Sequence, residues 1–351
     1  MVKIIGWDIG GVNSKAALIN YEKGKFKEIN LCSKYFPIFK HRRNEFFDEL
    51  REINTEIAKD EKIKIMAVTI TAELSDAFFN KKEGLNFIIK CFNECFPETD
   101  IFFLNNKGNF LSYNEISDKI LTLAATNWIA TAYLVSKNIN NCLIIDIGST
   151  TTDIIPILNG KLSTASLTDL DRLISGELVY TGLLRATIPS IIHNLEIKGK
   201  KSRISFEKFA LMADIHLVLN HISEQEYTCE TADDRPKNYL NSLARISRVV
   251  CADNEMLKEE EILNLAKQLY EAQVKIIKDA IEQVIEKYQA FQDRNFPIVV
   301  LGLGGKILGE IAAKRLGFIN INYLSNILGD EGSKVAPSVA VAFMLGDKMR
   351  L

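Results

Sequence analysis

One short pattern occurs twice in the chain, and it limits the possible fold more than any other feature. An apolar strand, the tripeptide Asp-Ile-Gly, a small polar turn and a second apolar strand follow one another over residues 4–19 and again over residues 142–157. Each copy reads as a hairpin with its polar side chains at the bend. Two such hairpins far apart in one chain indicate two similar lobes that face each other.

The bend of the second copy has the composition of a phosphate clamp. Gly148 lets the backbone approach an anion, the following turn can donate amides and hydroxyls to phosphate oxygens, and Asp146 and Asp153 can hold a Mg²⁺ ion. With Asp8 of the first copy, they suit a Mg²⁺-phosphate centre between the lobes. Because Mg²⁺ keeps several waters, we expect some of the three aspartates to act through water. The alternative is that the aspartates only stabilise their turns through hydrogen bonds to the backbone.

A third glycine-rich segment lies near the C-terminus. Residues 299–306 end an apolar strand, pass through three glycines and lead into a helical pattern at Ile307. Glycines at such a place suit a ligand packed against the backbone. A dinucleotide-binding fold is the competing interpretation. It fails because Ile307 stands where its third glycine belongs, and because the next strand ends near Asn322 without an acidic residue for a ribose.

The two hairpins followed by a late Gly-Gly loop resemble the fold shared by sugar kinases, actin and the DnaK-type chaperones. The expected class is therefore α/β, a two-lobe actin-like ATPase fold (a duplicated ribonuclease H-like unit) with a central cleft. Four further segments are similar to the short archaeal and methylotroph branch of the hydantoinase/oxoprolinase-like proteins, namely residues 71–78, 127–132, 176–182 and 231–237. This resemblance covers nearly the whole length of the chain.

The resemblance implies a function and a cofactor. Within the branch the chain is similar to the methanogen enzymes of methanofuran biosynthesis. That similarity implies a transferase that alkylates the phenol oxygen of γ-glutamyltyramine with an aminomethylfuran methyl diphosphate and releases pyrophosphate, with Mg²⁺ as cofactor. The wider fold implies two alternatives that use ATP, a kinase and an amide hydrolase of the hydantoinase/oxoprolinase type. A nucleotide-binding regulatory protein also stays open.

The candidate site residues follow from these positions and from the resemblance. Asp8 and Asp146 are expected to hold the metal, and Asp153, Glu73 and Lys15 to take part in catalysis, with Asp153 and Glu73 as alternative bases for the phenol. Phosphate contacts are expected from the three glycine-containing segments and from one basic loop: Gly10, Gly11, Asn13, Ser14, Gly148, Ser149, Thr150, Thr151, Gly304, Gly305, Arg235 and Lys237. Glu73 follows an apolar strand directly, where ligands bind in such sheets, although capping the next helix explains it equally well.

The expected lobes have definite boundaries. One lobe comprises residues 1–139, completed by a C-terminal helix over residues 337–350. The other comprises residues 140–336, with a helical insertion around residues 165–255. Apolar residues at helical spacing predict helices over four segments: 44–59, 82–96, 116–135 and 259–289.

Composition excludes several classes of function. The formal net charge is −2, so we expect no surface for polyanions and no nucleic-acid partner. The apolar runs are too short for a membrane span, and Lys3 leads directly into a strand, so no signal peptide is expected. Six scattered cysteines suit reduced thiols in the cytoplasm. A homo-oligomer stays open.

Two spacings suggest a metal site, but we favour simpler explanations for both. Cys91 and Cys95 lie one helical turn apart, where core packing accounts for them. His216 and His221 are five residues apart, and side chains at that spacing on a helix do not share a face well.

Overall fold

A computed structural model describes residues 1–40, 45–59 and 61–350 of the chain. Asn44, the expected first residue of one helix, lies outside these ranges. The chain divides into two compact units. Unit 1 comprises Met1–Cys142, Ile155–Arg172 and Leu324–Leu351, and unit 2 comprises Leu143–Ile154 and Leu173–Tyr323. The long N-terminal segment and the C-terminal segment thus belong to one unit.

The sheet of unit 1 begins with the first predicted hairpin. Strand β1 (Val2–Gly10) runs antiparallel to β2 (Asn13–Glu22), which pairs with β3 (Lys25–Tyr35) in the same sense. On its other side β1 runs parallel to β4 (Ile65–Thr71), and β4 runs parallel to β5 (Asp100–Leu104). With β6 (Phe110–Ser112) at the edge, the order is β3-β2-β1-β4-β5-β6. The ends of the parallel strands β1 and β4 therefore lie side by side.

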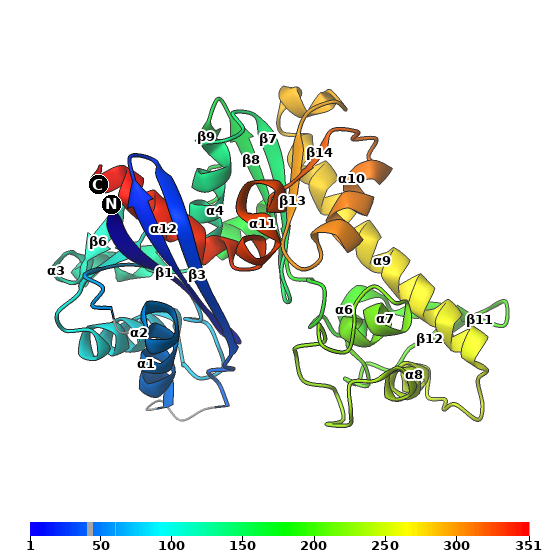
Figure 1. Cartoon of the computed structure of the whole chain (residues 1–351). Coiled ribbons are helices and arrows are strands. Elements are labelled where there is room, and N and C mark those ends of the chain that lie inside the picture. Colours follow the sequence, from blue (N-terminus) through cyan, green and yellow to red (C-terminus); the bar gives the residue numbers. More distant parts are fainter. Residues whose placement is uncertain (41–44, 60, 351) are drawn as a thin grey trace. The chain divides into compact units, whose positions relative to one another are not determined.

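Helices cover both faces of this sheet. Helices α1 (Glu45–Ala58) and α2 (Lys81–Cys95) bury their apolar faces with alternate residues of β1 (Figure 1). Helix α12 (Ala336–Met349) packs on the other face, against β1, β2 and α4 (Asn127–Ser136). Gly6 permits this approach, because a Cβ there would lie 1.9 Å from the carbonyl oxygen of Ser338. The predicted helices over 44–59, 82–96 and 337–350 are thus confirmed, with ends that differ by about one residue within the described ranges.

The predicted single helix over residues 116–135 is wrong. The chain instead forms α3 (Tyr113–Ile116), a 3₁₀ helix (Ser117–Leu123) and then, after a break, α4. At the break Ala125 has a φ of 51° and donates its N–H to the carbonyl oxygen of Ile70 at 2.9 Å. The break therefore allows the backbone to run alongside the end of β4 and to form a hydrogen bond with it.

The second sheet repeats the arrangement of the first. Strands β7 (Cys142–Ile147) and β8 (Thr152–Leu158) are neighbours joined by a short turn, so they form the second predicted hairpin. The short strands β9 (Lys161–Leu162) and β10 (Leu178–Val179) pair with β8. On the other side β13 (Ile298–Leu301) runs parallel to β7, and β14 (Ile321–Tyr323) runs parallel to β13. Both sheets thus place a hairpin beside parallel strands.

Among the remaining helices of the described ranges, one is long and the others are short. Helix α9 (Glu259–Ile285) follows the amphipathic stripe that the sequence predicts. It packs against α7 (Met212–Val218), α8 (Tyr239–Arg248) and α10 (Glu310–Arg315) (Figure 1). The other elements are α5 (Asp169–Ser175), α6 (Ile188–Ile191), β11 (Asn194–Ile197), β12 (Lys200–Arg203), α7 (Met212–Val218), α8 (Tyr239–Arg248), a 3₁₀ helix (Gln289–Gln292), a π-helix (Gly305–Gly309), α10 (Glu310–Arg315) and α11 (Ser325–Lys334). In the described ranges no helix combines the length and the apolar character that crossing a bilayer requires.

Candidate active site

The turn of the first hairpin, which we call the first bend (residues 8–15), holds a buried carboxylate. Asp8 is 5% exposed and lies opposite Lys15 in the β1–β2 register, with the Lys15 Nζ 3.8 Å from its carboxylate. The hydroxyl of Thr69 on β4 donates to the carbonyl oxygen of Trp7 at 3.1 Å and lies 3.4 Å from Asp8 Oδ1. The carboxylate is therefore fixed from both neighbouring strands.

The expected phosphate-contacting residues of the first bend differ in exposure. Gly10, Gly11 and Asn13 are half-buried, which suits contact with a ligand. Ser14 is 1% exposed and pairs with Ile9, whose side chain belongs to the hydrophobic core. Its side chain thus lies on the core-facing side of the hairpin, and its Oγ has no hydrogen-bond partner among the described residues.

Glu73 lies just beyond the end of β4 and is buried beneath α2. It is 1% exposed, and a Cβ at Gly84 of α2 would lie 2.5 Å from the Glu73 carbonyl oxygen. The expected alternative, in which Glu73 caps this helix, is wrong. Asn80 is the N-cap residue, and its side chain accepts a hydrogen bond from the N–H of Glu83 at 2.9 Å.

Two charged residues complete a group that we call the Glu73 cluster (Glu73, Lys81 and Asp169). The Lys81 Nζ lies 3.5 Å from Glu73 Oε1 and 3.2 Å from Asp169 Oδ2. Glu73 Oε2 is buried and has no hydrogen-bond partner among the described residues. Burial raises the pKa of Glu73 to about 7, although Lys81 opposes the rise. A carboxyl group with this pKa can gain or lose a proton near neutral pH.

The sequence neighbours of the Glu73 cluster are exposed apolar side chains. Leu74 is 64% exposed, Phe79 94% and Leu170 67%. All three belong to unit 1, as the cluster does. The cluster is therefore flanked in the chain by apolar side chains that are open to solvent.

The turn of the second hairpin, which we call the second bend (residues 146–153), presents small polar side chains. Residues 148–151 are half-buried, and the hydroxyls of Ser149 and Thr150 lie 3.4 Å apart. The N–H of Gly148 closes the turn by donating to the carbonyl oxygen of Thr151 at 2.9 Å, so this amide serves the turn itself. Asp153 lies opposite Leu178 in the β8–β10 register and is also half-buried.

A neighbouring segment holds the second bend in place. The backbone N–H groups of Leu183, Leu184 and Arg185 donate to the carbonyl oxygens of Gly148 and Ser149, at 2.9 to 3.0 Å. A Cβ at Gly182 would lie 2.6 Å from both the Gly148 oxygen and the Thr150 nitrogen. The segment over residues 181–185 therefore fits the bend without a gap, and only glycine is accommodated at position 182.

The late glycine-rich segment packs against the same bend. A Cβ at Gly302 would lie 2.5 Å from Asp146 Oδ1, and one at Gly304 would lie 2.5 Å from the Ile147 side chain. The N–H of Gly304 donates to the carbonyl oxygen of Ile147 at 2.9 Å. Packing within the protein thus accounts for these two glycines, whereas the sequence suggested that a ligand required them.

The basic loop over residues 228–237 is anchored by buried charges. The carboxylate of Asp233 accepts hydrogen bonds from Arg245 at 3.1 Å and from Arg248 at 2.8 Å. The side chain of Arg235 is 60% exposed, and the Lys237 ammonium lies 5.8 Å from the ring centre of Tyr227. The exposed guanidinium therefore stands on a loop whose backbone is held in one place.

The helical spacing considered for His216 and His221 does not apply, because the helix ends between them. Helix α7 ends at Val218, Asn220 adopts a φ of 56°, and the N–H of His221 donates to the carbonyl oxygen of His216 at 2.8 Å. This reversal places the two Nδ1 atoms 3.0 Å apart. Over the described ranges, no three or more His, Cys, Asp or Glu side chains gather in a way that would hold a metal ion.

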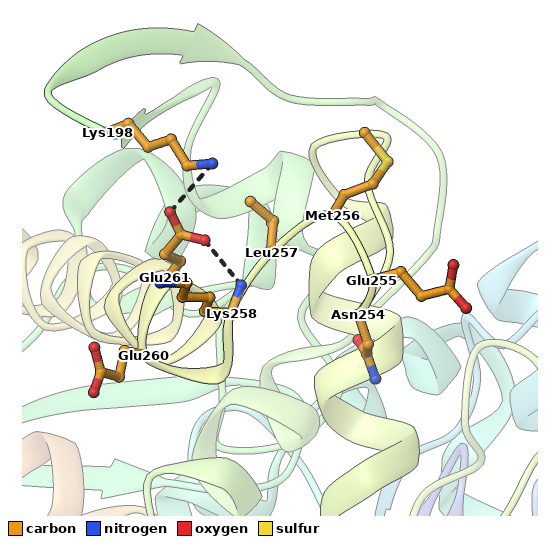
Figure 2. A pocket seen from close by; sticks show the side chains of 8 residues that line it. All are labelled: Lys198, Asn254, Glu255, Met256, Leu257, Lys258, Glu260 and Glu261. Carbon is orange, nitrogen blue, oxygen red and sulfur yellow. Dashed lines mark hydrogen bonds and ion pairs between the residues drawn. The ribbon is translucent and has the colours of Figure 1, made fainter.

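A surface hollow of about 530 Å³ lies elsewhere, at the start of α9 (Figure 2). Glu261 spans it by accepting hydrogen bonds from the backbone N–H of Lys258 at 2.8 Å and by pairing with Lys198 at 3.4 Å. These contacts cap the helix, and Figure 2 shows no side chains converging on a ligand position. The hollow does not include any residue of the two bends or of the Glu73 cluster.

Both sheets carry an acidic bend on a repeated hairpin-and-parallel-strand topology, which defines the actin-like ATPase and sugar kinase fold. Acetone carboxylase in its nucleotide-free form, from a study of ATP-dependent acetone carboxylation, shares this fold with a TM-score of 0.54. The match covers 91% of this chain and 68% of that chain at 11% sequence identity. The hydantoinase/oxoprolinase family model matches residues 64–348, and the chain belongs to this family.

Two relatives carry the same name. The (4-{4-[2-(γ-L-glutamylamino)ethyl]phenoxymethyl}furan-2-yl)methanamine synthase of Methanocaldococcus jannaschii is 36% identical over 345 residues, 98% of each chain. A protein of that name from Methanococcus vannielii is 37% identical over 221 residues, which are 62% of this chain and 97% of the relative.

Proposed function

We propose that the chain is a synthase that joins an aminomethylfuran methyl diphosphate to the phenol oxygen of γ-glutamyltyramine in methanofuran biosynthesis. The name of the relatives supports this assignment, because it describes a product in which a phenoxymethyl ether links a tyramine derivative to a furan. The identity of 36% across 98% of both chains supports the same reaction in this chain. The structural observation that carries the proposal is the buried Glu73 carboxyl group at the end of β4.

The reaction requires one bond to break and one to form. The bond between the furfuryl carbon and the diphosphate oxygen breaks, and its electron pair leaves with pyrophosphate. The phenol oxygen forms the new bond to that carbon, and the phenol proton must move to a base. The electron-rich furan ring stabilises positive charge on the furfuryl carbon. The protein therefore has to neutralise a leaving diphosphate and accept one proton.

Glu73 is the base that we propose for the phenol. Its pKa of about 7 makes it a stronger base than an ordinary carboxylate while leaving much of it ionised at neutral pH. Lys81 stays close to the carboxylate, so the ionised form is tolerated despite its burial. Asp153, the alternative base, is half-buried at the bend that we assign to phosphate.

The second bend is the segment that we propose for diphosphate binding. Its hydroxyls are half-buried and its backbone is fixed by the segment over residues 181–185. Arg235, on its anchored loop, and Lys237 are further candidates for contact with an anion. Lys15 and the half-buried Gly10, Gly11 and Asn13 are the corresponding candidates in unit 1.

The aspartates of the two bends fit a Mg²⁺ ion in their chemistry. Asp8 is buried beside a hydroxyl and a lysine, and Asp146 is held against Gly302 with no room for a Cβ between them. Fixed carboxylate oxygens are the ligands that Mg²⁺ prefers in proteins. Bound there, Mg²⁺ would supply positive charge to the leaving diphosphate. We therefore propose each of the two carboxylates, Asp8 at the first bend and Asp146 at the second, as a Mg²⁺ ligand of its own bend.

Pyrophosphate release distinguishes the candidate functions. The purified chain is incubated with Mg²⁺ and the furan diphosphate, with and without γ-glutamyltyramine, and pyrophosphate and the ether are measured. We expect both products to form in equal amounts, and only when the phenol is present. ADP formed together with phosphorylated γ-glutamyltyramine would instead support the kinase, and ADP with free phosphate and a cleaved amide would support the amide hydrolase. Tight nucleotide binding without any product would support a regulatory protein.

A further inference from the structure

Four polar side chains form a connected group inside unit 2, and the mechanism above does not use them. We call His216, His221, Tyr270 and Gln273 the Gln273 cluster. His216 and Gln273 are both 0% exposed, although Gln273 lies on the apolar stripe of α9. A buried amide and a buried imidazole on a core-facing surface are costly unless each finds partners, so their contacts indicate what they do.

The orientation of the Gln273 amide follows from its partners. Its Nε2 lies 2.8 Å from the carbonyl oxygen of Gly182 and 2.9 Å from the hydroxyl of Thr181. A carbonyl oxygen can only accept, so the NH₂ group must face Gly182. The oxygen Oε1 must then face His216, whose Nε2 lies 2.9 Å away.

The same logic fixes the protons of both histidines. His216 Nε2 must carry a hydrogen, because Gln273 Oε1 can only accept. Burial lowers the pKa of His216 to about 3, so the ring is neutral and its Nδ1 is an acceptor. His221 Nδ1, at 3.0 Å, must therefore donate to it. One unbroken series of hydrogen bonds thus runs from His221 through His216 and Gln273 to Gly182.

Both ends of the Gln273 cluster contact segments that pack on the second bend. Gly182 and Thr181 belong to the segment that holds residues 148–150, and the Thr181 carbonyl oxygen accepts from the Thr152 hydroxyl at 2.7 Å. Tyr270, whose ring centre lies 4.8 Å from that of His221, donates its hydroxyl to the carbonyl oxygen of Ile307 at 3.0 Å. Ile307 lies in the π-helix that follows the late glycine-rich segment.

We propose that the Gln273 cluster is a positioning network that holds the second bend in its phosphate-binding geometry. The series of hydrogen bonds fixes Gly182, and Gly182 fits against the bend with no space for a Cβ. The backbone and hydroxyl groups of residues 148–151 are then fixed before a diphosphate binds. This inference rests on the proposed function only in its assignment of diphosphate to the bend.

The test uses two substitutions of Gln273 and one matched control. Gln273→Glu keeps the size of the side chain and its contact with His216, and in its ionised form it replaces the donor to Gly182 by an acceptor. Gln273→Leu removes both contacts. Gln268→Leu is the control, because Gln268 lies on the same helix and bonds the backbone of Glu196 on the β11–β12 hairpin at 2.7 and 2.9 Å.

Two measurements are made on the full chain with Mg²⁺, namely hydrogen exchange of the amides in residues 148–152 and 182–185, and the affinity for pyrophosphate. We expect both Gln273 variants to exchange faster in these segments alone and to bind pyrophosphate roughly tenfold or more weakly. The KM for γ-glutamyltyramine should stay unchanged, as should all measurements on Gln268→Leu.

The outcomes separate this inference from the proposed function. Unchanged exchange in both Gln273 variants would overturn the positioning network. Faster exchange with unchanged pyrophosphate affinity would support the positioning network. It would contradict the assignment of diphosphate binding to the second bend. If Gln273→Leu fails to fold, Gln273→Met replaces it, since it keeps the length of the native side chain and also removes both contacts.

Discussion

The two bends have the same topology and different chemistry. In unit 1 the bend and the adjacent end of β4 contain charged groups, with Asp8 beside Lys15 and Glu73 beside Lys81. In unit 2 the bend carries Asp146 and Asp153 but no lysine or arginine, its turn is lined by hydroxyls, and it is held by backbone hydrogen bonds and a neutral amide. The first arrangement suits the movement of a proton, and the second suits a fixed anion. A duplicated fold can thus keep its backbone and divide the chemistry between its copies.

The largest effect should come from Glu73→Gln in unit 1. The variant keeps the shape of the side chain but cannot accept a proton, so we expect kcat to fall by about 10²- to 10⁴-fold. Steady-state pyrophosphate release measures it, and binding of pyrophosphate should be unchanged because the second bend is intact. A variant with full turnover would show that another group, with Asp153 the first candidate, takes the proton.

Stability offers an independent check on the same residue. The pKa of Glu73 is raised from 4.5 to about 7 in the folded protein, so the folded state binds the proton more tightly than the unfolded state. Stability from this group is therefore present below pH 4.5 and is lost as the pH rises through about 7. Relative to the native chain, Glu73→Gln should become more stable between pH 5 and 8, by about 1–3 kcal/mol in chemical denaturation.

The next largest effect concerns the carboxylate of the second bend. Asp146→Asn removes a proposed metal ligand without changing its size, and we expect kcat/KM to fall about 100-fold with a higher Mg²⁺ requirement. Titration of activity with Mg²⁺ measures both. Asp8→Asn should act in the same direction. An unchanged Mg²⁺ requirement in both variants would contradict the assignment of these two residues.

Two glycine substitutions test how closely the segment over residues 181–185 packs on the second bend. Gly182→Ala places a Cβ 2.6 Å from backbone atoms of the bend, so we expect a loss of about 1–3 kcal/mol in stability and weaker pyrophosphate binding. Gly148→Ala is the matched control for stability alone, since its Cβ would meet nothing closer than 3.7 Å. Calorimetry of both variants checks the difference, and equal behaviour would mean that the bend tolerates movement.

A smaller effect should appear in the pH dependence of kcat/KM, with opposite directions in two variants. Lys81 lowers the pKa of Glu73 and Asp169 raises it. Because the base must be ionised, the acid limb of kcat/KM should move to higher pH in Lys81→Met and to lower pH in Asp169→Asn, by about one unit or less. If the acid limb moves in the same direction in both variants, it does not report the ionisation of Glu73.

Much of the scaffold is predictable from local pattern, while the site requires contacts between distant residues. The Asp-Ile-Gly hairpins at Asp8 and Asp146 repeat within the sequence, so the topology can be inferred from it. Asp169 lies far from Glu73 in the chain and meets it through Lys81, and no local pattern marks that contact. The exception is Gln273, where a polar residue on the apolar stripe of a helix is a visible signal.

The errors of prediction have local causes in the backbone. The helix expected over residues 116–135 breaks because Ala125 adopts a left-handed conformation, which propensity does not predict for alanine. The histidine pair forms because Asn220 reverses the chain after α7, so the helical spacing no longer applies. In both cases a single residue with positive φ overrides a periodic pattern.

The pH dependence of phenol-driven pyrophosphate release tests the central claim most directly. The native chain and Glu73→Gln are compared with Mg²⁺, the furan diphosphate and γ-glutamyltyramine from pH 5.5 to 9. We predict that kcat/KM of the native chain rises with pH and levels off above about 7, and that the variant lacks this rise. Pyrophosphate release that is independent of the phenol, or an identical pH profile in the variant, would contradict the assignment of proton transfer to unit 1.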